Sequence, residues 1–378
     1  MENLPIYILA AILLVYASYL GYNFYKTYPI KERFAPERTF GLVLRSKLPL
    51  ELKLKLNASN LQGPTITGKI DLPPLPVMFD LREKWPGLMT EPLNQGSCGS
   101  CWAFAIALAC SDRLRIAEPD HPALTKIIKY YDPQEDTYLD TLNNFSPWHL
   151  AACNLCEDHP MASDIKSYGI CQSLACEGGI LQLCMQYIKQ NGMITAEDDP
   201  RHDECLADKT KCDYQCSFPK DITIYKPSEV HQIDETRASG IGQEKGDYMR
   251  YSIMNSGPLV VGFAIYQSFM TFFANPDNEN KVYGVKAKSS FGSDREIGGH
   301  AVTIIGWGED LEEPDVSSQK YWLIRNSWGK SWSKDGNFKL ARGFNFLGIA
   351  EDVWSSHFSA DSWHEKIAPE NYTYPGAR

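Results

Sequence analysis

The 378-residue sequence has no excess of positive charge, no internal repeat and, beyond residue 25, no long hydrophobic run. Its net charge of −10 argues against nucleic-acid binding as a main role, because an acidic surface repels phosphate backbones. The lack of repeats and low-complexity tracts excludes a solenoid, a collagen-like fibre and a largely disordered chain. With 43% hydrophobic and 22% charged residues, the composition is that of a globular protein long enough for two domains.

The one candidate membrane segment runs from Leu4 to Tyr25, carries no charge and is long enough to cross a bilayer as a helix. The basic stretch that usually opens a secretory signal is missing, since only Glu2 precedes the run. Residues 1–25 are therefore expected to be either a transmembrane anchor or a signal sequence cleaved near Ser18. The basic residues that follow the run would, by the positive-inside bias, leave the body of the chain in the cytoplasm.

A basic leader precedes an acidic body. Residues 1–74 carry nine Lys and Arg against five Asp and Glu, a net charge of +4, so the rest of the chain carries −14. The leader ends in DLPPLP at residues 71–76, and such a proline-rich stretch disfavours regular structure and is typical of a linker. Residues 26–75 are expected to be either a plain spacer or a pro-segment held partly by charge on the body.

A candidate nucleophile stands at Cys101, within the run QGSCGSCWAFA at residues 95–105. The residues after it are rich in helix formers, whereas Gly96 and Gly99 before it break regular structure. Cys101 is therefore predicted to begin a helix, where the helix dipole stabilises a thiolate and lowers the thiol pKa. The backbone N–H at that position, with the side chain of Gln95 as a second donor, is suited to binding an oxyanion.

The candidate partners of this thiol are His300 and Asn326. His300 opens the apolar, β-branched run HAVTI after two glycines, which predicts a strand. Asn326 follows the strand-like run YWLIR, and Trp328 is placed to cover an Asn–His hydrogen bond. The three polar groups would form a nucleophile, a base and a residue that orients the base, although a lone histidine near a strand is more often structural.

Together these stretches resemble the papain-like cysteine peptidases, and within them the cathepsin B-like group. The order Cys, His, Asn and the wide spacing fit that family, and the resemblance covers about residues 76–355. Further similar stretches, in chain order, are FDLREKW at 79–85, SDRLR at 111–115, CEGG at 176–179, NSGP at 255–258 and IGWG at 305–308.

The resemblance implies an α+β, papain-like fold of two domains with the active-site cleft between them. A mainly helical left domain, residues 76–217, would carry the nucleophile. A β-barrel-like right domain, residues 218–356, would carry the catalytic His and Asn. The N-terminal hydrophobic helix and the pro-segment would precede this body, and residues 357–378 would form a polar C-terminal tail.

The resemblance also implies substrate-binding residues. Gly178, Gly179 and Trp328 would line the cleft, and Asp352 would form the floor of the pocket for the second residue before the cut. A carboxylate there accepts Arg as well as apolar groups, unless it points to solvent. The cathepsin B-like group removes C-terminal dipeptides with a long loop that carries paired histidines. The matching stretch here, about 193–217, is shorter and holds a single histidine, so we expect an endopeptidase.

The sequence holds 11 cysteines, most of them between residues 98 and 216. With Cys101 free for catalysis, Cys110 and Cys184 fall in helical patterns and are expected to be buried thiols. The alternative for four of the others is a zinc site that uses Cys153-x-x-Cys156 and Cys212-x-x-x-Cys216 with a nearby His. The disulfides that the family implies are Cys98–Cys176, Cys153–Cys212, Cys205–Cys216 and, as a fourth pair, Cys156–Cys171.

The expected function is a cysteine endopeptidase, made as a zymogen, that forms an acyl-enzyme and needs no cofactor or metal. Its partners would be protein or peptide substrates and its own pro-segment, an intramolecular inhibitor; we expect a monomer, membrane-bound if residues 4–25 are retained. Four disulfides require an oxidising compartment, and this requirement outweighs the charge bias beside the N-terminal run. We therefore expect a secretory, lumenal or lysosome-like setting, or a virion. Sequons at Asn57, Asn144 and Asn371 would suit a glycoprotein. The rival functions are an inactive papain-fold binding protein, an acyl or peptidyl transferase, and a membrane-tethered structural protein.

Overall fold

The computed structural model describes residues 40–58, 70–132, 135–153, 176, 178–199, 222–233, 238–239, 244–290, 292–359 and 364–367. All of them belong to one compact unit, Arg38–Arg378. Within these residues no helix has the length and apolar character that a bilayer crossing requires. The hydrophobic run Leu4–Tyr25 lies outside the described residues, so its role stays a prediction.

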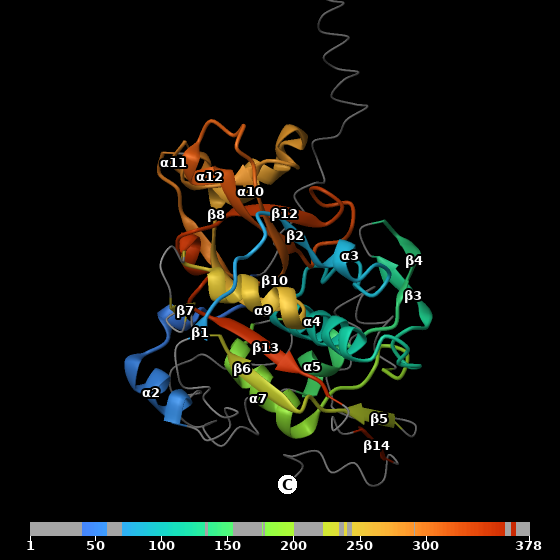
Figure 1. Cartoon of the computed structure of the whole chain (residues 1–378). Coiled ribbons are helices and arrows are strands. Elements are labelled where there is room, and N and C mark those ends of the chain that lie inside the picture. Colours follow the sequence, from blue (N-terminus) through green and yellow to red (C-terminus); the bar gives the residue numbers. More distant parts are fainter. Residues whose placement is uncertain are drawn as a thin grey trace, which may run out of the picture. The chain divides into compact units, whose positions relative to one another are not determined.

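The long helix α4, Cys101–Ala117, is the central element of the unit. It is rich in Ala and Leu and holds neither Gly nor Pro, which favours a helix. Every residue from Cys101 to Arg115 is buried, as expected of a helix that is covered on all sides. Figure 1 shows α4 (teal) between two shorter helices and a long strand, namely α5 (Pro147–Cys153), α7 (Leu181–Asn191) and β10 (Glu296–Glu309).

An eight-stranded sheet packs against α4 through β10. The strand order is β6-β13-β8-β10-β11-β12-β9, and β2 pairs with β10 beside this path. The central strands β8 and β10 are buried along most of their length and rich in Val, Ile and Gly, so side chains cover both faces of the sheet there. The other strands are β2 (Phe79–Asp80), β6 (Glu229–Gln232), β8 (Leu259–Tyr266), β9 (Val282–Tyr283), β11 (Lys320–Arg325), β12 (Asn337–Ala341) and β13 (Val353–His357).

Shorter elements surround this core. The remaining helices are α2 (Leu50–Ala58), α3 (Leu81–Lys84), α9 (Asp247–Ser256), α10 (Gln267–Ala274), α11 (Val285–Ser289) and α12 (Val316–Gln319), with 3-10 turns at Arg45–Lys47, Pro276–Asn278 and Phe346–Gly348. Three two-stranded sheets join β1 (Ile70–Asp71) to β7 (Ala238–Ser239), β3 (Ile127–Asp132) to β4 (Thr137–Leu142), and β5 (Ile222–Tyr225) to β14 (His364–Ile367).

Two large hydrophobic clusters fill the interior. The first surrounds α4, α5 and α7, and its largest side chains include Trp102, Phe104 and Trp148. The second lies against the sheet and contains Trp307 and Trp322. Since α4 contacts β10, the two clusters meet where the helix that begins at the candidate nucleophile lies against the strand that carries the candidate base.

Several elements were not expected from the sequence. The hairpin β3–β4 stands among the early helices, where no strands were predicted. Strand β14 pairs with β5, so part of the stretch expected to be a polar tail is a strand. The helices α9 and α10 likewise lie within the stretch that was expected to be rich in strands.

Candidate active site

Cys101 is the first residue of α4 and is completely buried. The loop before it is tied down by a disulfide between Cys98 and Cys176 and by a hydrogen bond from Gly99 N to Cys176 O of 2.9 Å. Position 99 admits only glycine, because a Cβ there would lie 2.2 Å from the oxygen of Cys176. The close approach of these two chain segments therefore fixes where the helix begins.

His300 and Asn326 lie on neighbouring strands. His300 belongs to β10, and Asn326 directly follows β11, which pairs with β10 in antiparallel fashion. His300 Nε2 donates to Asn326 Oδ1 at 2.8 Å, and the same oxygen accepts from Ser327 N at 2.9 Å. The ring of Trp328 stacks on the imidazole with 4.7 Å between centroids, so it covers this hydrogen bond.

The packing of α4 against β10 brings the thiol to the strand backbone beside His300. The backbone N–H of Ala301, the residue after His300, hydrogen-bonds to the sulfur of Cys101. One turn further along α4, Thr303 Oγ1 donates to the Ala105 carbonyl at 3.3 Å. The helix and the strand are thus joined at two successive positions, and the first of them is the candidate active site.

Burial raises the pKa of the Cys101 thiol to about 11, although hydrogen bonds from the backbone of Ala301, Gly41 and Trp102 lower it. The backbone at the helix start does lower this pKa, as expected, but burial outweighs it in the arrangement seen here. The physical reason is desolvation: a thiolate without water is costly, and the helix end does not compensate for it. Gly41, which belongs to the leader, is one of the groups that exclude water from the sulfur.

Hydrogen bonds hold Gln95 to two segments of the active site, the loop before Cys101 and the turn after Asn326. Its Nε2 donates to the Cys98 carbonyl at 2.7 Å, and its Oε1 accepts from Ser327 Oγ at 2.6 Å. Its backbone N–H donates to the Ser327 carbonyl at 2.9 Å. Three hydrogen bonds thus hold Gln95 rigidly beside the start of α4, and rigidity is one requirement of an oxyanion donor.

The leader segment, residues 40–58, covers the thiol. Leu42 forms an antiparallel bridge to Gly299 and a parallel bridge to Gly179, with hydrogen bonds of 2.6–3.2 Å on the two sides. Gly41 passes so close to the nucleophile loop that a Cβ on it would lie 1.6 Å from the oxygen of Gly99. The leader therefore runs between the CEGG loop and β10, over the sulfur of Cys101.

The rest of the leader is anchored to the outside of α7. Leu52 and Leu56 of α2 are buried against Ile180 and Leu183. Between them Gln182 donates from Nε2 to the Leu56 carbonyl at 2.9 Å and accepts from Arg45 Nη1 at 2.5 Å. An apolar patch and a buried amide thus fix the leader on the body.

The two glycines predicted to bind substrate contact the leader instead. Gly179 N donates to the Gly41 carbonyl at 2.6 Å, and the Gly179 carbonyl accepts from Val43 N at 3.0 Å. A Cβ at Gly178 would lie 2.6 Å from the Gly41 oxygen, and one at Gly179 would lie 2.6 Å from the ring of Trp102. Only glycines let an extended peptide approach the backbone this closely.

Asp352 points inward, with 2% of its surface exposed. Its Oδ1 accepts from Trp354 Nε1 at 2.6 Å, and burial raises its pKa to about 6. It lies beside a cavity of about 250 Å³ that the acidic Glu296 and Glu351 also line. A Cβ on Gly262 would touch both the side chain of Leu42 and Asp352, so the leader places an apolar side chain next to this carboxyl.

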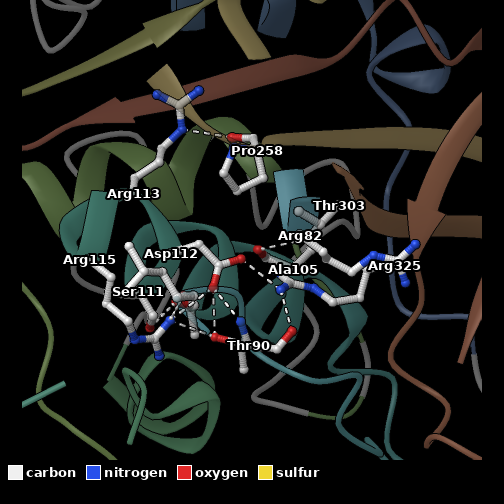
Figure 2. Close-up of polar contacts among 12 residues, drawn as sticks. Arg82, Thr90, Ala105, Ser111, Asp112, Arg113, Arg115, Pro258, Thr303 and Arg325 are labelled. Atoms are coloured by element: carbon white, nitrogen blue, oxygen red, sulfur yellow. Dashed lines mark hydrogen bonds and ion pairs between the residues drawn. The ribbon is translucent and has the colours of Figure 1, made fainter. Parts of the chain in front are cut away.

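A buried ion-pair network links α4 to the strand that leads to Asn326, and sequence reasoning missed it. Figure 2 shows the carboxylate of Asp112 between the guanidinium groups of Arg115 and Arg325, with Thr90 beside it. The Asp112–Arg325 contact measures 2.7 Å and is almost fully buried. Charged residues inside an otherwise apolar helix were the available signal, because such charges are rarely buried without partners.

Several predicted cysteines lie outside the described residues, namely Cys156, Cys171, Cys205, Cys212 and Cys216. Cys153 is disulfide-bonded, which contradicts the zinc alternative for that residue, and its partner lies among the cysteines that are not described. Cys110 and Cys184 are free and buried. In the described part of the chain, no three side chains form a cluster that would hold a metal ion.

Comparison with known proteins supplies independent information. The family model described as papain family cysteine protease matches residues 75–126 and 137–357. The chain is 30% identical over 294 residues to Cathepsin B-like CP2 of Giardia intestinalis, which covers 78% of this chain and 77% of that protein. It is 28% identical to Cathepsin B-like CP3 of the same organism, over 77% of each chain.

Among solved structures, proCathepsin B S9 from Trypanosoma congolense is similar to this chain. The two superpose with a TM-score of 0.53 and 20% sequence identity, over 85% of this chain and 86% of that one. At this identity the likeness concerns the fold, which combines helices and a sheet in the same arrangement.

Proposed function

The chain belongs to the papain family of cysteine proteases, and we propose that Cys101, His300 and Asn326 carry out peptide hydrolysis in it. The observation that supports this most is the 2.8 Å hydrogen bond from His300 Nε2 to Asn326 Oδ1, next to the start of α4. Because the Nε2 proton of His300 is donated to Asn326, the other ring nitrogen, Nδ1, is the one that would exchange a proton with the thiol.

In the proposed mechanism Cys101 and His300 form a thiolate–imidazolium pair once the leader has left. The thiolate attacks the peptide carbonyl, and the backbone N–H of Cys101 and the Gln95 amide hold the oxyanion. His300 protonates the leaving amine, which leaves an acyl-enzyme on Cys101. Water, deprotonated by His300, then hydrolyses this thioester.

We propose that the leader, within residues 26–75, is the pro-segment of a zymogen. It occupies the space over the sulfur that a substrate needs, and it contributes to the burial that raises the thiol pKa. Cleavage between Asp71 and Val77 would release it, since residues 73–77 have no regular structure and are mostly exposed. The body would then consist of a helical half, 76–217, and a β-rich half, 218–356, a division that the two hydrophobic clusters support.

The proposed specificity centres on Asp352. A buried carboxyl beside Gly262 and near the acidic Glu296 suits a basic side chain at the second position before the cut, and the protonated carboxyl suits an apolar one. The short stretch at 193–217 supports endopeptidase rather than dipeptidase action.

We further propose that the body folds in an oxidising compartment. Support comes from the Cys98–Cys176 disulfide and the bonded state of Cys153, because such bridges persist outside reducing cytosol. Residues 4–25 would then act as a signal or as an anchor that leaves the body on the lumenal side.

The test is a peptidase assay on the purified chain after incubation at pH 4 to 7, with peptides that carry Arg or Phe at the second position. We expect cleavage of both, self-removal of the leader, and complete loss of turnover in Cys101→Ala. Cys110→Ala changes another free cysteine and should stay active. Turnover that survives in Cys101→Ala would refute the assignment.

A further inference from the structure

One strand of the hairpin β3–β4 lies outside the family match. The family model matches up to residue 126 and again from 137, so it leaves out β3 (Ile127–Asp132) and includes β4 (Thr137–Leu142). The two strands pair without interruption from Ile127 with Leu142 to Asp132 with Thr137. Figure 1 shows the hairpin (green) beside the loop that connects α3 to α4.

One face of this hairpin is buried against that loop. Tyr130 and Asp132 are each 1% exposed, whereas Ile127 at the start of β3 is 63% exposed. The alternation of a strand explains this pattern, because residues 130 and 132 point to one face. The polar side chains of Tyr130 and Asp132 therefore point from the hairpin into the interior.

Both side chains form hydrogen bonds with the same residue, Asn94. The Tyr130 hydroxyl accepts from Asn94 N at 2.9 Å and donates to the Asn94 carbonyl at 2.7 Å. Asp132 Oδ1 accepts from Asn94 Nδ2 at 3.0 Å. The backbone and the side chain of Asn94 are thus both held by the hairpin.

Asn94 directly precedes Gln95 and also forms a hydrogen bond with Gly96, the residue that follows Gln95. The Asn94 Oδ1 accepts from Gly96 N at 2.9 Å, so Asn94 restrains the chain before and after Gln95. It forms a bridge to Trp328, and a Cβ on Gly329 would lie 3.0 Å from Asn94 Nδ2 and 3.1 Å from Asp132 Oδ2. The hairpin therefore packs where the Gln95 loop meets the turn after Asn326.

We infer that Tyr130 and Asp132 are positioning residues for the oxyanion donor Gln95. They act through Asn94, and the inference rests on the peptidase activity proposed above. A hydrogen-bond donor stabilises an oxyanion only when it is held in place before the reaction. In this chain strand β3 of the hairpin supplies part of that restraint, by holding Asn94 next to Gln95.

The test compares Tyr130→Phe and Asp132→Asn with two controls on the outer face of the same hairpin. Tyr131→Phe removes a hydroxyl that binds the exposed Asp136, and Asp140→Asn breaks an exposed ion pair with Lys129. Each full-length variant is matured by a trace of tagged wild-type protein that is then removed. Three quantities are measured: kcat and KM for a peptide, the affinity of a peptide aldehyde, and the rate of Cys101 alkylation by iodoacetamide.

We expect kcat to fall about 10- to 100-fold in Tyr130→Phe with little change in KM, because misplacing a catalytic group by about 1 Å has an effect of that size. Aldehyde affinity should fall in parallel, because the aldehyde adduct places its oxygen where the oxyanion forms. Alkylation should stay within twofold, since displacement at a saturated carbon forms no oxyanion. Both controls should behave as the wild type, and Asp132→Asn should repeat the loss more weakly.

A double variant separates positioning from general damage. In a Gln95→Ala background, Tyr130→Phe should cause no further loss of kcat. The inference is overturned if Tyr130→Phe and Asp132→Asn both keep kcat and aldehyde affinity within twofold, if alkylation falls as much as kcat, or if the losses with Gln95→Ala multiply. A wild-type chain without peptidase activity would instead refute the proposed function and the inference with it.

Discussion

At the scale of single residues, burial favours the protonated, neutral form of two side chains, Cys101 and Asp352. Burial raises the pKa of the Cys101 thiol to about 11 and that of the Asp352 carboxyl to about 6. Both shifts favour the neutral form, since charge is costly where water is excluded. The thiol is covered by a removable segment, whereas Asp352 is also buried by the body itself.

The first prediction concerns Cys101. A thiol with a pKa near 11 is only about one part in 10⁴ ionised at pH 7, so iodoacetamide should label Cys101 slowly in the full-length chain, at a rate that rises with pH up to about 11. After removal of the leader, labelling at pH 6 should be at least about 100-fold faster. The measurement is the labelling rate of each form against pH, and equal rates in both forms would contradict the account.

The second prediction concerns Asp352. A carboxyl with its pKa raised to about 6 is protonated below that pH and ionised above it. The ratio of kcat/KM for Arg over Phe at the second position should therefore rise, on the order of tenfold, from pH 5 to pH 7. Asp352→Asn should abolish the rise, and Glu351→Gln, on an exposed residue of the same cavity, should keep it. A ratio that is constant in the wild type would argue against Asp352 as the specificity residue.

At the scale of elements, the junction of α4 with the sheet sets the geometry of the site. The third prediction is that Asp112→Asn destabilises the protein by about 3–5 kcal/mol, because Arg115 and Arg325 then stay buried without their carboxylate. Glu91→Gln, which removes an exposed ion pair with Lys330, should change stability little. Urea unfolding of the three proteins tests this, and similar midpoints for Asp112→Asn and wild type would contradict it.

Much of this geometry follows from local sequence pattern. The helix predicted to begin at Cys101 does begin there, and His300 and Asn326 lie on and directly after strands, as the apolar β-branched runs indicated. The hairpin was not foreseen, because β3 lies outside the family match and its partner, Asn94, is distant in sequence. The net upward shift of the thiol pKa was not foreseen, since a pattern shows the helix end, which lowers the pKa, but not the chain that covers the sulfur and buries it.

At the scale of the whole molecule, the proposed pro-segment lies over the sulfur of Cys101, between the CEGG loop and β10. The fourth prediction is that Gly41→Ala loosens this contact, because a Cβ there would lie 1.6 Å from the Gly99 oxygen. The full-length variant should hydrolyse peptides at least about 10-fold faster than the wild type before maturation. Leu50→Ala, on the exposed side of α2, is the control and should have no effect. If both variants stay as inactive as the wild-type chain, the leader does not inhibit through Gly41.

The acidic body and basic leader add a weaker, pH-dependent component to this inhibition. Lys47 of the leader forms an ion pair of 3.3 Å with Glu296, and Arg45 lies close enough to Asp352 to lower the pKa of that carboxyl. Burial raises the pKa of Asp352 to about 6, so its protonation in acid would remove its attraction for Arg45, which favours release of the leader at low pH. The exposed pair contributes little alone, so the apolar contacts of α2 remain the main anchor.

The most direct measurement of the central claim is a titration of the matured protein with a peptidyl epoxide, followed by mapping of the label. The account predicts that one mole of probe per mole of protein abolishes peptide hydrolysis, that the label is on Cys101, and that His300→Ala labels much more slowly at pH 6. Hydrolysis that survives complete labelling of Cys101, or loss of activity through a label on Cys110 or Cys184, would contradict it.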